Sequence, residues 1–249
     1  MIDSVDSILD KLKFYNDDYK FKFDPIKHRY TYDGEYFIPV TQFISRFHEK
    51  FDSEFWSKSK AEELGKTTEE ILEEWKILND RGNEIGKKTH LWIENYFLKT
   101  YQELPLDLDI IDRINKFNIA YSKFLYKLVP ITFEQMIFSK KWKIAGTMDS
   151  LFFYKEKIII IDWKTNKEFT DDEHYKGRFQ KLLSPFDGYY KNNFNEYSIQ
   201  VSLYRLILKE IGINIQGCYL LHIGPSSEAK MYTAIDFTGI LESYLNSLE

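Results

Sequence analysis

Two apolar segments separated by two charged residues constrain the fold of this chain more than any other feature. Residues 144–154 and 157–163 flank Lys155-Glu156, and the second segment contains four consecutive isoleucines. A two-residue loop between two such segments predicts an antiparallel β-hairpin. Each segment carries one aspartate, Asp149 or Asp162, where a core residue would be expected. A buried carboxylate is costly unless it is paired or bound to a metal, so the hairpin needs a compensating group.

The expected register of the hairpin brings the two aspartates together. The two-residue loop pairs Tyr154 with Lys157, and the same register places Asp149 opposite Asp162. Opposed residues lie on the same face of the sheet. Lys164 follows Asp162 by two residues and therefore lies on that face as well. One interpretation is a structural ion pair of Lys164 with one aspartate. Two aspartates in register instead favour a site for a divalent cation with oxygen ligands, Mg²⁺ or Mn²⁺, suited to metal-assisted hydrolysis of a phosphodiester.

The remainder of the chain predicts further strands and several helices. Residues 21–40 alternate around Asp33-Gly34 as in a hairpin, and Thr41 is expected to cap a short helix that ends near Phe47. The other predicted helices are 53–99, with Thr67 or Thr68 as the cap and a break near 79–86, 107–128, ended by Pro130, 197–211, and a terminal helix. The other predicted strands are 131–138, 217–223 and 229–235.

These elements predict an α/β (α+β) fold with a central mixed β-sheet flanked by helices and an N-terminal helical region. We expect a single domain over residues 1–249, in which 1–130 form the N-terminal hairpin and helical part and 131–249 form the core that carries the chemistry.

Composition excludes several classes of protein. A single cysteine, Cys218, permits no internal disulfide and no iron–sulfur cluster held by four thiolates. The chain start lacks the apolar core of a secretory signal, and no segment has the ~18 consecutive apolar residues of a membrane span, so we expect a cytoplasmic protein without a membrane partner. The net charge of −5 leaves a nucleic-acid partner open, because a local basic groove is sufficient.

The hairpin resembles the signature of the PD-(D/E)XK nuclease superfamily, an aspartate on one strand followed by (D/E)xK on the next. Here Asp149 is followed by Asp162-Trp163-Lys164. The segment AGTMDSLFFYKEKIIIIDWKTNK is similar to the G-T-x-D…I-D-x-K-T block of the RecB-like branch, which includes phage exonucleases and the mitochondrial genome maintenance exonuclease. YSIQVSLYRLIL resembles the QxxxY helix of that branch, EIGKKTHLWIENYF its helical histidine motif, and HRYTYDGEYFIPVTQFI the strand-and-VT entry of phage members. The resemblance covers most of residues 28–208, and the two-strand block is its specific part.

The resemblance implies a restriction-endonuclease-like core and a role for each matching residue. Asp149 and Asp162, the backbone carbonyl of Trp163 and the imidazole of His90 would hold the metal, and Lys164 would be the catalytic lysine. Four more residues would support the ligands or contact the substrate: Glu134, Glu94, Gln200 and Tyr204. The structural alternatives are an ion pair for Lys164, a satisfied core histidine at His90, and plain helix packing for Gln200 and Tyr204.

Basic and aromatic side chains near these motifs have two interpretations. The lysines either neutralise phosphates of a DNA strand or form an ordinary solvated surface; they are Lys87, Lys88, Lys140, Lys141, Lys143 and Lys167. The rings of Phe186, Tyr189, Tyr190 and Phe194 either stack on bases or pack in the interior.

The expected function is that of a divalent-metal-dependent DNA nuclease. The resemblance favours an exonuclease acting on DNA ends, preferably single-stranded, in phage or bacterial replication, recombination or repair, with the helical region arching over the strand path. The alternatives are an endonuclease of the same fold and a catalytically silent nucleic-acid-binding protein. No phosphate-binding loop of the Walker type occurs, so no nucleotide cofactor is expected.

Overall fold

The computed structural model describes residues 4–27, 29–170, 180–225 and 228–248. The helices are α1 (Val5–Asn16), α2 (Val40–Ile44), α3 (Ser53–Leu64), α4 (Thr68–Leu98), α5 (Leu108–Lys123), α6 (Asn193–Glu210) and α7 (Thr238–Asn246), with short 3₁₀ turns at Ser45–Phe47 and Leu125–Lys127. The strands are β1 (Phe21–Asp24), β2 (Arg29–Tyr32), β3 (Glu35–Pro39), β4 (Val129–Ser139), β5 (Ile144–Tyr154), β6 (Lys157–Lys164), β7 (Gly217–His222) and β8 (Lys230–Thr233). None of the helices in the described ranges is long and apolar enough to span a membrane.

The strands form one mixed sheet in the order β1-β2-β3-β5-β6-β7-β8, and β4 pairs with β5 outside this path. The β3–β5 and β6–β7 pairs are parallel, and the other pairs are antiparallel. The predicted mixed sheet flanked by helices is therefore confirmed. Because β3 pairs with β5, the N-terminal hairpin part and the C-terminal part of the chain share a single sheet.

The central hairpin has the predicted loop and register. Lys155 and Glu156 both have positive φ, 46° and 63°, as a two-residue hairpin turn of the primed type requires. Tyr154 pairs with Lys157, and the ladder continues in the same register to Leu151 and Ile160. Glycine or asparagine would adopt these angles more readily, so the strands, rather than the loop residues, determine the turn.

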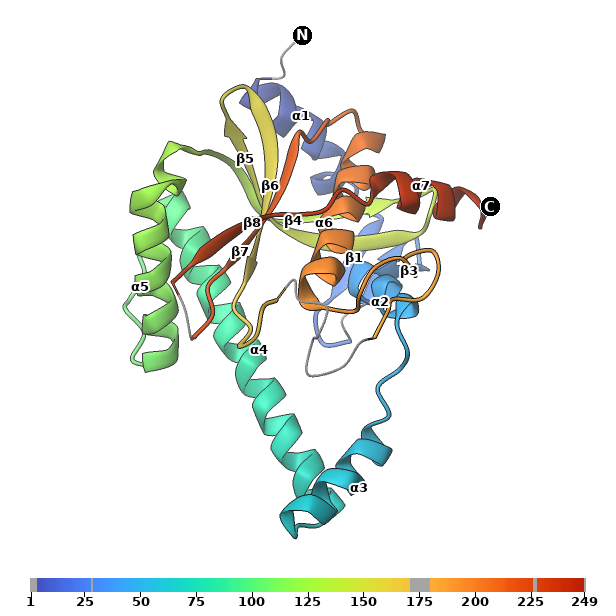
Figure 1. The fold of residues 1–249 in the computed structure, drawn as a ribbon. Coiled ribbons are helices and arrows are strands. Elements are labelled where there is room, and N and C mark those ends of the chain that lie inside the picture. Colours follow the sequence, from blue (N-terminus) through green and yellow to red (C-terminus); the bar gives the residue numbers. More distant parts are fainter. Residues whose placement is uncertain (1–3, 28, 171–179, 226–227, 249) are drawn as a thin grey trace.

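The isoleucine run is continuous because both faces of the sheet are covered. Ile158 and Ile160 belong to the core on the side of α6, α1 and α7, whereas Ile159 and Ile161 belong to the core beneath α4 and α5. Figure 1 shows these two groups of helices on opposite sides of the strands. Side chains alternate along a strand, so Asp162 extends the first series and faces α6.

Helix α4 runs without the predicted break, and this expectation was wrong. It spans 31 residues and begins with a capping box, in which Thr67 and Glu70 satisfy each other's backbone groups. Each glycine in a helix interior costs about 1 kcal/mol, but packing of the same region against its neighbours outweighs this. Arg81 forms paired bonds of 2.6 and 2.7 Å to Asp107 before α5. A Cβ at Gly86 would lie 3.3 Å from Thr165 Oγ1, so this glycine allows α4 to approach the end of β6 closely.

Two other predicted helix boundaries were wrong. Thr41 lies inside α2, whose N-cap is Pro39. The helix before the core strands ends at Lys123, and Pro130 is the second residue of β4. A proline is tolerated there because β4 pairs with β5 alone and the ladder shifts register between Pro130 and Thr132.

Helix α3 and the first half of α4 form an arm that projects from the rest of the molecule (Figure 1). Ala61 of α3 and Ile71 of α4 are buried within it. Because α4 continues from the arm to the sheet, the residues of its second half are held rigidly against the strands that carry the aspartates.

Candidate metal centre

Four elements converge where the central hairpin opens. Strand β5 contributes Asp149, β6 contributes Asp162 and Lys164, β4 contributes Glu134, and the second half of α4 contributes His90. The geometry therefore brings together both predicted hairpin acids and two of the other residues predicted from the resemblance.

The tightest group consists of His90, Glu134 and Asp149, whose ligand atoms all lie within 4.8 Å of one another. His90 Nδ1 lies 3.7 Å from Glu134 Oε1 and 3.6 Å from Asp149 Oδ2. The Asp149 side chain is 12% exposed and that of Glu134 is 41% exposed, so the group is open to solvent on one side.

Glu134 owes its position to an irregularity in β4. Phe133 pairs with Ser150 and Gln135 pairs with Met148, so the same register places Glu134 opposite Asp149. Its φ is +43°, a left-handed conformation that costs a residue with a side chain about 1–3 kcal/mol. In this conformation Glu134 is a third ligand-type side chain beside His90 and Asp149.

Beside the aspartates, hydrogen bonds from side chains replace the backbone pairing of β5 with β6, which ends at Leu151 and Ile160. The backbone N–H of Trp163 donates to Asp149 Oδ2 at 2.8 Å, and the Ser150 hydroxyl donates to the carbonyl of Ile161. The strands thus exchange part of their backbone pairing for bonds that fix Asp149.

Lys164 is held from three sides. Its Nζ lies 2.6 Å from Asp162 Oδ2, donates to Gln200 Oε1 at 3.0 Å, and lies 4.0 Å from the centre of the Tyr197 ring. The contacts continue along α6, because Gln200 donates to the Tyr204 hydroxyl at 2.9 Å and Tyr204 donates to the carbonyl of Thr147 at 2.8 Å. The two residues of the predicted QxxxY pair therefore connect Lys164 to β5.

The fold disfavours ionisation of both aspartates by raising their pKa. Burial raises the pKa of Asp149, as does the nearby charge of Glu134, against the lowering effect of His90 and Lys164. Burial and the charge of Asp149 raise the pKa of Asp162 to about 6, although Lys164 lowers it. An added cation beside these groups would relieve the cost of ionising them.

The two basic groups, His90 and Lys164, hold their protons more tightly than usual. Burial alone would lower the pKa of His90, but Asp149, Glu134 and Asp162 outweigh it and raise that pKa to about 9. Burial likewise works against the pKa of Lys164, yet Asp162, Tyr197 and Asp149 raise it above its usual value. Lys164 is therefore a firmly charged ammonium group.

The residues present fit a divalent cation. Carboxylate oxygens are suitable ligands for both Mg²⁺ and Mn²⁺, and the one imidazole suits Mn²⁺ better than Mg²⁺. Asp162 is only 1% exposed, and its Oδ1 has no hydrogen-bond partner among the described residues. A buried carboxylate oxygen without a donor is a costly feature unless a ligand satisfies it. Asp162 lies outside the tight group of three, so its role as a ligand stays a prediction.

Sequence reasoning missed Tyr197. It precedes Gln200 by three residues and Tyr204 by seven, a spacing that places all three on one helical face. A buried lysine packed on an aromatic ring gains up to about 2 kcal/mol when water is excluded. The periodicity alone would have identified Tyr197 as a neighbour of the predicted pair.

The remaining predicted ligands and supports lie close by. Glu94 is one turn after His90 on α4, and partial burial together with Glu134 raises its pKa. The Trp163 ring is buried beneath α4 and α5 while its backbone contacts Asp149. These positions are compatible with the predicted roles, which stay predictions.

Most of the predicted DNA-binding lysines already have partners. Lys140 contacts Asp18 and the Tyr32 hydroxyl at 3.1 and 2.6 Å. The other engaged lysines are Lys88 with Glu84, Lys141 with Asn246, and Lys143 with Glu35. Lys140, Lys141 and Lys143 also lie in the β4–β5 turn, before the start of β5, which favours a structural role. Lys87 and Lys167 are exposed.

The aromatic residues after β6 pack in the interior. Phe186 is fully buried, with its ring centre 4.8 Å from that of Phe47. Tyr189 lies against Phe237 at 4.8 Å, and Phe194 lies near Tyr232. Base stacking on Phe186 is therefore excluded by its burial, and the packing interpretation of that ring is correct.

No family model matches the chain, and no curated protein matches it. Among solved structures, the chain is similar to SSO0001, known from a crystal structure, with 13% sequence identity and a TM-score of 0.32 over 98% of this chain and 85% of that one. A TM-score of this size carries no argument about fold or function.

Proposed function

We propose that this protein is a divalent-metal-dependent nuclease that hydrolyses phosphodiester bonds in DNA. The observation that carries the proposal is the convergence of His90, Glu134 and Asp149 within 4.8 Å of one another, beside a buried Asp162–Lys164 ion pair. Such a set combines ligands for a cation with a fixed ammonium group, which is what attack on a phosphate needs.

Each side chain has a defined part in this reaction. His90, Glu134 and Asp149, with Asp162 beside them, would hold a Mg²⁺ or Mn²⁺ ion, which would supply neutralisation of charge on the phosphate and a lower pKa of the attacking water. Lys164 stabilises the negative charge that develops on the phosphate, because Asp162, Gln200 and Tyr197 hold its ammonium group in one position. Gln200 and Tyr204 act through Lys164 and β5 rather than through the phosphate.

The finer assignment rests on the resemblance of the two-strand block. The RecB-like pattern around Asp149 and Lys164 favours an exonuclease that acts on DNA ends, preferably single-stranded ones. By the same resemblance, replication and recombination proteins in the cytoplasm of a bacterium or phage-infected cell are the expected context.

Product analysis on labelled DNA tests the proposal. The purified protein is incubated with 5′- and 3′-labelled single and double strands and with a circular single strand, in Mg²⁺, Mn²⁺ or EDTA. We expect metal-dependent release of short products from linear strands and no cleavage of the circle. Cleavage of the circle would identify an endonuclease. Binding of DNA without any cleavage in either metal would contradict the proposal and favour a silent binding protein.

Metal uptake should release a proton from His90. With a pKa of about 9, the imidazole is protonated at pH 7.5 and must lose that proton to bind a cation. We expect about one proton released per Mn²⁺ bound, measured as the difference in calorimetric heat between buffers of different ionisation enthalpy. His90→Gln should abolish the release. Equal proton release by wild type and His90→Gln would exclude His90 as a ligand.

A further inference from the structure

The outer face of the β1–β2–β3 meander carries cations that the candidate metal centre does not use. Lys22 pairs in register with Thr31, and Asp24 pairs with Arg29, so these side chains share one face. Together with Lys27 they line a hollow of about 550 Å³. We call Lys22, Lys27 and Arg29 the basic meander face.

The positive charge of this face is offset only in part, by Asp24. Asp24 is the one acidic residue that lines the hollow, and its Oδ1 accepts the backbone N–H groups of Ile26 and Lys27 at 3.0 and 3.1 Å. No carboxylate of the described residues forms an ion pair with Lys22, Lys27 or Arg29. Lys20, which follows Tyr19, differs because it is paired with Asp33 at 3.0 Å.

An aromatic ring completes the face. Tyr36 of β3 pairs in register with Thr31 and therefore lies on the same side as Lys22. The guanidinium of Arg29 lies over its ring, 5.1 Å from the centre. Cations beside an accessible aromatic ring form the kind of surface that tracks a nucleic-acid backbone and accepts a base.

The meander is attached directly to the candidate metal centre. On its inner side, the Tyr30 hydroxyl lies 3.1 Å from Thr147 Oγ1, two residues before Asp149 on β5. Strand β3 also pairs in parallel with the beginning of β5. A strand of substrate that leaves the metal centre across β3 and β2 would reach the basic meander face.

The projecting arm offers a less suitable path. Residues 52–80 include nine acidic and four basic residues, so the arm repels phosphates. The arch over the strand path that the sequence suggested would therefore need another source of affinity for DNA, whereas the meander carries its own.

We propose that the basic meander face binds the phosphate backbone of the DNA strand, outside the nucleotide that is hydrolysed. This inference rests on the proposed function, since it identifies the second contact surface of the same substrate. Lys22, Lys27 and Arg29 each contact a phosphate, and Tyr36 supports Arg29.

Binding in EDTA tests this surface apart from catalysis. Fluorescence anisotropy with a labelled single-stranded oligonucleotide compares wild type with Lys22→Gln/Lys27→Gln/Arg29→Gln from 50 to 200 mM NaCl. Each contact to a single strand contributes about 0.7 to the salt slope, so three lost contacts reduce it by about 2. Over this fourfold range the wild type should then lose about 20-fold more affinity than the variant. A duplex of the same length shows whether the face distinguishes the two forms.

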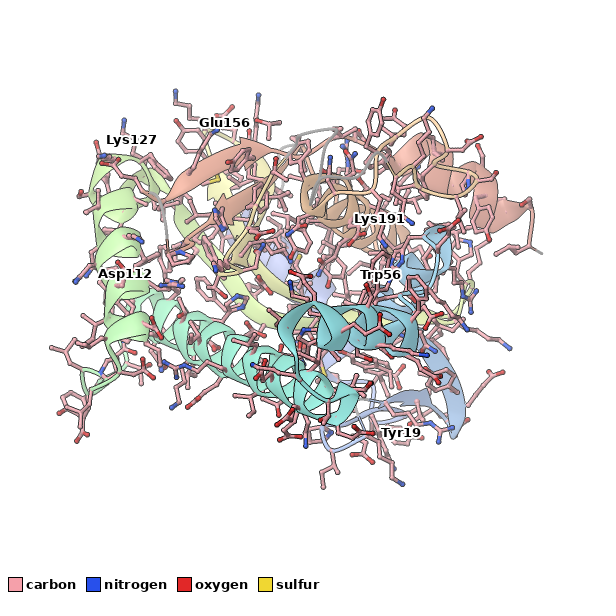
Figure 2. The ribbon with its side chains drawn as sticks, turned by 60° about the horizontal axis from the view of Figure 1, so that its bottom comes forward. Tyr19, Trp56, Asp112, Lys127, Glu156 and Lys191 are labelled. Atoms are coloured by element: carbon pink, nitrogen blue, oxygen red, sulfur yellow. The ribbon has the colours of Figure 1, made fainter. Side chains whose placement is uncertain are left out.

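A matched control lies on the other side of the molecule. Lys127→Gln/Lys155→Gln/Lys157→Gln removes the same charge at the β5–β6 turn and at the 3₁₀ turn after α5. In Figure 2, Lys127 and Glu156 lie far from Tyr19, just before β1. This control should keep the wild-type slope. Lys22→Arg/Lys27→Arg should also keep it, because the charge is retained. In wild type, bound oligonucleotide should protect Lys22 and Lys27 from acetylation while Lys155 and Lys157 react as before.

The outcomes separate this inference from the proposed function. Wild type that cuts DNA while the first triple variant binds with unchanged affinity and slope would overturn the inference alone, as would unprotected Lys22 and Lys27. Binding that depends on the basic meander face without any cleavage would support the inference and contradict the nuclease proposal. A protein that neither binds nor cuts DNA would overturn both.

Discussion

Replacing Asp149 by asparagine is expected to abolish Mn²⁺ uptake and to slow DNA cleavage by about a thousandfold, equivalent to about 4 kcal/mol of transition-state stabilisation. Asp149 belongs to the tight group with His90 and Glu134, and its side chain is less exposed than that of Glu134. An amide keeps the size of the side chain and can still accept the Trp163 N–H bond, so the fold should be retained.

The same substitution should not destabilise the metal-free protein. The pKa of Asp149 is raised by burial, which means that the folded state holds the proton more tightly than the unfolded state. A carboxyl of this kind favours folding at low pH and opposes it once the pH exceeds its folded pKa. A neutral amide removes that cost near pH 7, so we expect a Tm in EDTA equal to or above that of wild type.

Thermal unfolding distinguishes this result from simple damage. At a concentration 100 times the Kd, Mn²⁺ should stabilise wild type by about 2.7 kcal/mol and raise its Tm by about 5–10 °C, whereas Asp149→Asn should show no shift. Asp80→Asn, an exposed change on α4, should behave as wild type. A full Mn²⁺ shift in Asp149→Asn would remove Asp149 from the metal centre.

The sequence was sufficient to predict the central hairpin because local and long-range signals agreed there. The two-residue loop, the alternation around it and the burial of both faces all specify one register, which the structure confirms from Tyr154–Lys157 to Leu151–Ile160. The break predicted in α4 failed for the opposite reason. Two glycines, Gly82 and Gly86, weaken the helix locally, but contacts with α5 and β6 that periodicity does not reveal keep it continuous.

The candidate site was only partly predictable because its assembly depends on backbone detail. The left-handed conformation of Glu134 is a local departure from strand geometry that composition does not encode, and this residue, expected in a supporting role, lies in the tight group. Likewise, the lysines near the motifs could not be sorted by sequence alone. Those in the β4–β5 turn contact Asp18 between α1 and β1, Tyr32 of β2, Glu35 of β3 and Asn246 at the end of α7, whereas Lys22, Lys27 and Arg29 of the meander have no ion pair within the described residues.

Replacing Lys164 should separate two effects of its ammonium group. The first is electrostatic support of Asp162, whose pKa of about 6 would rise once Lys164 no longer lowers it. The second is stabilisation of charge on the phosphate. Lys164→Met removes both, so we expect weaker Mn²⁺ binding at pH 6.5 and cleavage slower by about a hundredfold to a thousandfold.

Lys164→Arg should remove only the second effect. A guanidinium keeps Asp162 ionised and should bind Mn²⁺ nearly as wild type does, but its larger planar group cannot occupy the position between Gln200 and the Tyr197 ring. Single-turnover cleavage should therefore fall about a hundredfold in Lys164→Arg while metal affinity is preserved. Lys157→Met, at the other end of β6, serves as the control. Wild-type cleavage by Lys164→Met would reduce Lys164 to an ion-pair partner of Asp162, because a charge that can be removed without loss of rate takes no part in attack on the phosphate.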